Sequence, residues 1–124
     1  MSQRFASDIH HYEQRPTAAL ASLENDSKVV EANRKKIKQF LEYIRAEGLS
    51  TPRQVRYIHV LRKLSSLLGK QFRRTTKTDM IRVISELEKH DTVYDTKLSE
   101  KQCIKRFYKW LRNAEDYYPI EEVD

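Results

Sequence analysis

Glycine, proline and cysteine are scarce in this chain. Its 124 residues include two Gly, three Pro and one Cys. So few turn-forming residues argue against an all-β fold, while Lys, Arg, Glu, Leu and Ala are abundant. The single Cys103 cannot form a disulfide within the chain, and no second cysteine stands near a histidine pair to complete a zinc site. The composition predicts an all-α protein in which Cys103 is a small buried apolar residue.

Long apolar runs and catalytic motifs are missing as well. No stretch reaches the length of a membrane span, and residues 1–16 lack the apolar core and cleavage site of a secretory signal. We expect a cytoplasmic protein without membrane contact. The chain has no Gly-rich phosphate loop, HExxH, paired-cysteine or G-x-S-x-G motif, so we expect no catalytic, cofactor, metal or small-molecule site. The adjacent His10 and His11 are interpreted as part of a solvated tail.

Acidic residues are absent from the middle of the chain. Residues 48–78 contain no Asp or Glu but eight cations, and residues 27–113 hold 22 of the 24 Lys and Arg and 9 of the 18 Asp and Glu, a net charge of +13. A domain charged in this way repels itself unless a polyanion or counterions screen it. Double-stranded DNA is therefore the predicted partner.

Apolar residues at spacings of three and four predict four core helices in one domain. A short helix over 17–24 is expected first. The first two core helices are expected over about 28–47 and from Ser50 or Thr51 to Gly69. The third is expected over 79–89, after a cap at Thr76 or Thr78, and the fourth from Asp95 or Thr96 to about Asn113. This is a compact four-helix bundle with an additional short N-terminal helix or arm (1–26), a helical domain (27–113) and an acidic tail or linker (114–124). The residues expected inside are Val30, Ile37, Phe40, Leu41, Ile44, Val55, Ile58, Leu61, Leu64, Leu68, Ile81, Ile84, Leu87, Cys103, Ile104, Phe107 and Leu111, with Trp110 only partly buried.

A ladder of cations follows the last helix. Like charges four residues apart weaken an isolated helix by a few tenths of a kcal/mol per pair, so the ladder indicates a role beyond helix stability. The alternative reading is a solvated face on a basic protein. The second core helix carries further polar residues opposite its apolar stripe. The candidate DNA-binding residues of the two helices are Arg53, Arg56, Tyr57, Arg62, Lys63, Lys97, Lys101, Lys105, Lys109 and Arg112. We expect them to share one continuous basic surface, with the third core helix facing away.

Four segments resemble, in order and spacing, the N-terminal SAM-like core-binding domain of tyrosine recombinases, the phage integrase and Xer-type family, in a phage-like or archaeal form. They are residues 33–50 with a Gly-Leu-Ser exit, 53–64, 76–81, and Arg106-Phe107-Tyr108-Lys109-Trp110-Leu111, where family members often read Phe-Tyr-x-Trp-Leu. Arg53 departs from the family, in which many members carry Thr there, and this leaves the cap of that helix at Thr51 or Arg53.

The resemblance implies a SAM-like bundle that binds DNA during site-specific recombination. In the family this domain grips one face of the recombination site, and proteins can associate with one another there. The family's catalytic Arg, His, Arg and Tyr belong to a following domain, which these 124 residues do not contain. The resemblance therefore implies a chain that binds DNA without cutting it. It is either part of a parent tyrosine recombinase, with 114–124 as the start of the interdomain linker, or a free-standing relative of that domain. The alternative is a helical protein-interaction or regulatory module whose cations meet an acidic partner.

Overall fold

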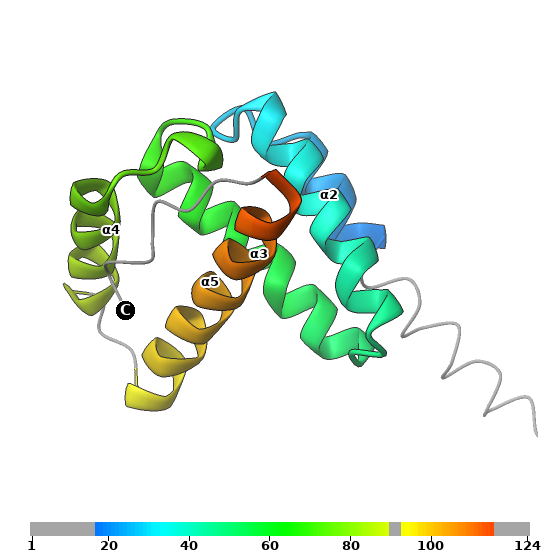
Figure 1. Ribbon diagram of the computed structural model, residues 1–124. Coiled ribbons are helices and arrows are strands. Elements are labelled where there is room, and N and C mark those ends of the chain that lie inside the picture. Colours follow the sequence, from blue (N-terminus) through cyan, green and yellow to red (C-terminus); the bar gives the residue numbers. More distant parts are fainter. Residues whose placement is uncertain (1–16, 90–92, 116–124) are drawn as a thin grey trace, which may run out of the picture.

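The computed structural model describes residues 17–89 and 93–115, and all regular structure in these two ranges is helical (Figure 1). A first helix over 17–24 is followed by α2 (Glu31–Ala46), α3 (Thr51–Leu68), the short 3₁₀ helix η1 (Phe72–Arg74), α4 (Lys77–Lys89) and α5 (Tyr94–Glu115). The predicted all-α bundle with a short N-terminal helix is confirmed. The expectations for residues 1–16 and 116–124, including His10, His11 and most of the acidic tail, fall outside the described residues.

Both glycines end helices, as predicted. Gly48 follows α2 with φ of 84°, and Gly69 follows α3 with φ of 66°, a left-handed conformation that glycine adopts without steric cost. After α2, the Gly48 N–H donates to the Arg45 carbonyl and the Leu49 N–H donates to the Ile44 carbonyl. These two bonds satisfy carbonyls of the last turn and turn the chain toward α3.

The predicted helix starts need several corrections. Asp79 N–H donates to Thr76 Oγ1 at 3.1 Å and Thr76 N–H donates to Asp79 Oδ2 at 2.9 Å, so the cap of α4 is Thr76 and not Thr78. Helix α5 begins at Tyr94, before the predicted caps, and extends to Glu115. Helix α2 begins only at Glu31, because a turn around Asp26 occupies the preceding residues. Helix α3 begins at Thr51 with Ser50 as the preceding cap residue, and the Ser50 side chain makes no capping hydrogen bond.

Helix α3 lies at the centre of the bundle and packs against α2, α4 and α5 (Figure 1). Between these helices, aromatic rings meet edge to face, with centroids 5.3 Å apart for Phe40 and Phe107 and 4.7 Å apart for Phe72 and Phe107. Most of the predicted core is buried, and Trp110 is half-buried as expected. The predicted residues found buried are Ile37, Phe40, Leu41, Ile44, Ile58, Leu61, Leu64, Leu68, Leu87, Cys103, Ile104, Phe107 and Leu111.

The predicted inward stripe of α4 is displaced by one residue. Ile81 is 56% exposed and Ile84 is half-buried, whereas Met80, Val83 and Leu87 face the core. Both sets fit a helical period, and the first turn capped by Thr76 fixes which set points inward. Two other predicted core residues also depart from expectation, since Val30 lies before the start of α2 and is 38% exposed, and Val55 is half-buried.

A buried asparagine ties the α3–α4 connection to α2. Asn33 Nδ2 donates to Ser65 Oγ at 2.8 Å and to the Lys70 carbonyl at 2.9 Å, while Asn33 Oδ1 accepts from the Phe72 N–H at 2.8 Å. All these polar atoms are satisfied, as burial requires. The contacts hold η1 against the aromatic core, where Tyr108 and Thr75 also share a buried hydrogen bond.

Candidate nucleic-acid interface

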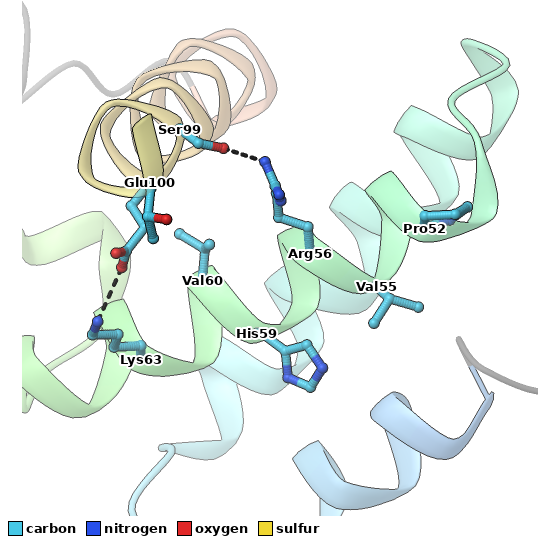
Figure 2. Close-up of a pocket in the computed structure, with 9 residues that line it drawn as sticks. Pro52, Val55, Arg56, His59, Val60, Lys63, Ser99 and Glu100 are labelled. Atoms are coloured by element: carbon cyan, nitrogen blue, oxygen red, sulfur yellow. Dashed lines mark hydrogen bonds and ion pairs between the residues drawn. The ribbon is translucent and has the colours of Figure 1, made fainter. Parts of the chain in front are cut away.

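A groove of about 540 Å³ separates α3 from the first half of α5 (Figure 2). Two polar contacts span it. Arg56 Nη1 donates to the Ser99 hydroxyl, and Lys63 Nζ donates to Glu100 Oε2 at 3.0 Å. In Figure 2, Arg56 and Lys63 both extend from α3 toward α5, with Val60 between them. The structure thus brings Arg56 and Lys63 to one groove, as the sequence predicts, but gives Lys63 a carboxylate partner.

Four of the predicted DNA-binding cations form ion pairs within the chain. Arg62 Nε lies 2.6 Å from Asp26 Oδ2, and Lys63 lies against Glu100 as described above. Lys97 and Lys101 both lie against Glu88 of α4, and Lys97 Nζ also donates to the Glu88 carbonyl oxygen at 3.0 Å. These pairs neutralise part of the charge that the sequence assigns to the surface.

The acids in these pairs respond to the cations. The hydrogen bond from Arg62 holds the pKa of Asp26 below its usual value, and the hydrogen bond from Lys101 does the same for Glu88. A carboxylate that is stabilised in its charged form in turn stabilises the neighbouring cation. Arg62 therefore joins α3 to the turn at Asp26, and Lys97 and Lys101 join α5 to α4. These pairs make the three cations weaker candidates for phosphate contacts.

The ladder on α5 is consequently divided between two sides of the helix. Lys97 and Lys101 face α4, whereas Lys105 and Lys109 line a hollow together with Tyr43 of α2. Residues four apart advance by about 40° around a helix, so a long row drifts from one neighbour to the next. The expectation that the third core helix, α4, faces away from the ladder is wrong for these two lysines.

Tyr57 is a further correction. The sequence places it on the exposed side of α3, but its side chain is 6% exposed and its ring packs edge to face on Phe40 at 5.3 Å. Burial raises the pKa of the Tyr57 hydroxyl, and the nearby Arg106 partly opposes this shift. With so little accessible surface, Tyr57 supports the residues above it and offers no side chain to a groove of DNA.

Three arginines of α3 and α5 lie close enough to Tyr57 and Cys103 to affect their pKa values. Burial raises the pKa of the Cys103 thiol, and the charges of Arg56 and Arg53 of α3 partly oppose this, just as Arg106 of α5 partly opposes the raised pKa of Tyr57. Arg53 and Arg56 are exposed and Arg106 is half-buried. Among the described residues, Arg56 contacts the neutral Ser99 hydroxyl, and neither Arg56 nor Arg106 forms an ion pair with an acid. We call Arg53, Arg56 and Arg106 the arginine cluster.

Arg106 was not predicted from the sequence, because it lies outside the row of lysines spaced four apart. A second row on α5, Gln102, Arg106, Lys109 and Asn113, recurs at spacings of four, three and four and could have indicated it. Together with Lys105, Trp110 and Tyr43 of α2, this row lines a second hollow of about 540 Å³. The exposed Lys105 and Lys109 thus lie with Arg106, while Arg112 is half-buried near the end of the same helix.

The residues that line the second hollow supply cations, amides and aromatic rings. Among residues 17–89 and 93–115, no group of three or more His, Cys, Asp or Glu could hold a metal ion. None of the helices in the described part of the chain is both long and apolar enough to cross a membrane. No family model, no curated protein and no solved structure matches this chain.

Proposed function

We propose that this chain is the DNA-binding, core-binding domain of a site-specific tyrosine recombinase or integrase, and that it holds the recombination-site duplex through α3 and α5. The observation that carries the proposal is the arginine cluster, which continues into Lys105 and Lys109 on the exposed side of α5. Guanidinium groups with neutral partners are well suited to phosphate oxygens. The order of the sequence segments adds the link to recombinases.

The proposed duplex-binding surface contains fewer residues than the ten candidates named from the sequence. Arg53, Arg56, Arg106, Lys105 and Lys109 are proposed to contact phosphates, whereas Arg62 and Lys63 are engaged by Asp26 and Glu100. Phosphate contacts supply affinity and position, and base edges supply sequence choice. Gln102, exposed on α5 between these cations, is the side chain best placed to hydrogen-bond a base edge. Self-association on a recombination site and a cytoplasmic location remain part of this proposal.

The proposal is tested by duplex binding at several salt concentrations with two matched double variants. In R53Q/K109Q two charges of the proposed surface are removed, and in K35Q/K89Q two exposed charges elsewhere are removed. We expect the first pair to weaken binding by more than about fivefold and to reduce the slope of log K against log salt by about 2, because each phosphate contact contributes about 0.9 to that slope. The second pair should change both quantities little.

Two results would contradict the proposal. Equal losses in the two double variants would mean that only net charge attracts DNA. Absence of duplex binding at low salt would favour the helical protein-interaction module, whose cations would meet an acidic protein.

A further inference from the structure

The second hollow differs from the groove in Figure 2 because aromatic rings form part of its wall. Tyr43 of α2 is 39% exposed and Trp110 of α5 is half-buried, and their ring centroids lie 6.2 Å apart with an angle of 34° between the planes. The exposed parts of these two rings are accessible to a ligand that stacks on them. The described groove between α3 and α5 has no such rings.

The rings of Tyr43 and Trp110 pack on the aromatic core. The Phe40 ring lies 6.0 Å from Tyr43 and 5.2 Å from Trp110, and Phe107 lies 5.9 Å from Trp110, centroid to centroid. Phe40 and Phe107 are fully buried, so the pair rests on the rigid core. A ligand that stacks on such rings loses little affinity to the ordering of side chains.

Cations and amides complete the wall on the side of α5. Arg106, Lys105 and Lys109 supply positive charge, and Gln102 and Asn113 supply both donors and acceptors. Glu47, which directly follows α2, is an acid close enough to Tyr43 to raise the pKa of its hydroxyl. The wall therefore offers three kinds of contact at once: flat apolar rings, positive charge and hydrogen-bonding amides.

A nucleotide whose base is unpaired matches all three. Its base can stack on an aromatic ring, its phosphate can meet the cations, and its polar edge can meet an amide. In a duplex the faces of the bases are covered by their neighbours, so the aromatic wall would stay unused. We propose that the hollow between α2 and α5 binds an unpaired nucleotide of single-stranded DNA. This goes beyond the proposed function, which concerns duplex DNA on the adjoining arginine cluster.

The experiment follows the fluorescence of Trp110, which is the only tryptophan among the 124 residues. Single-stranded thymidylate of about 12 nucleotides, within the usual site size of such surfaces, is titrated into the whole chain at low salt. We expect quenching of the emission, because a stacked base contacts the indole or its neighbour. The variant Y43A should bind about tenfold more weakly, in line with the loss of one stacked base. The matched control Y94A removes a tyrosine that is 75% exposed at the start of α5 and should bind as the original chain does.

A second variant guards against misfolding of Y43A. K109Q changes an exposed side chain of the same hollow and should lower the salt slope for the single strand by about 0.7. Absence of quenching would overturn the proposal, and so would equal weakening by Y43A and Y94A. Equal quenching by a duplex, or by a polyglutamate peptide, would also overturn it. The affinity of Y43A for a duplex separates the two proposals, because we expect this affinity to be unchanged. If the original chain binds no duplex but its fluorescence is still quenched by the single strand, only the recombinase proposal is contradicted.

Discussion

At the scale of single residues, the decisive contacts join side chains that are distant in sequence. Asp79, the third residue of α4, accepts a hydrogen bond from the Thr76 N–H and another of 2.8 Å from Lys70 Nζ, so one carboxylate connects the loop after α3 with the start of α4. These contacts lower the pKa of Asp79 to about 2, with the bond from Lys70 as the largest cause. Its side chain is 14% exposed, so solvent reaches it and moderates the effect.

The lowered pKa predicts a loss of stability in acid. Because the folded-state pKa lies below the usual value of 3.8, the contribution is fully present above pH 4 and disappears as the pH falls toward 2. We expect D79N to be less stable than the original chain at neutral pH, and the difference between the two to shrink between pH 4 and pH 2. Urea unfolding at a series of pH values measures this, and a constant difference across that range would contradict the assigned role.

At the scale of elements, α5 carries cations with different duties. Lys101 is paired with Glu88 of α4, whereas Lys109 lines the aromatic hollow. We expect K101Q to leave DNA binding almost unchanged and K109Q to weaken it by about two- to fivefold, since only the second charge is proposed to meet phosphate. Fluorescence anisotropy of a labelled duplex compares the two variants. The same change at two positions of one helix removes the same net charge, so equal effects would refute the division of the ladder.

The elements also show how far the sequence could predict this protein. The helices follow from local signals, namely apolar residues at spacings of three and four and the glycines at 48 and 69, and their bounds were predicted to within three residues. The partners of the cations come from other elements, as with Asp26 for Arg62 and Glu88 for Lys101. No local pattern contains that information. Tyr57 was misplaced for the same reason, because the ring that covers it, Phe40, belongs to a different helix.

At the scale of the whole molecule, one core joins all helices through α3. Leu61, at its centre, is fully buried. We expect L61A to lower the free energy of unfolding by about 2–5 kcal/mol, because the lost contacts and the remaining cavity both destabilise the fold. Denaturant unfolding followed by Trp110 fluorescence and by far-ultraviolet circular dichroism should give coincident transitions for both chains. A loss below about 0.5 kcal/mol would mean that this face of α3 is not part of the core.

Asn33 carries a consequence for reading related sequences. Its amide donates to Ser65 of α3 and to the Lys70 carbonyl, and accepts from the first N–H of η1. No other side chain of that length both donates twice and accepts. Aspartate would keep the shape but lose the donors, and leucine would leave the Phe72 N–H buried without an acceptor. Among proteins that share this bundle, an unvarying asparagine at position 33 would therefore record a requirement of folding. A polar residue that evolution never replaces is usually taken for a binding residue, and here that inference would point to the wrong place in the molecule.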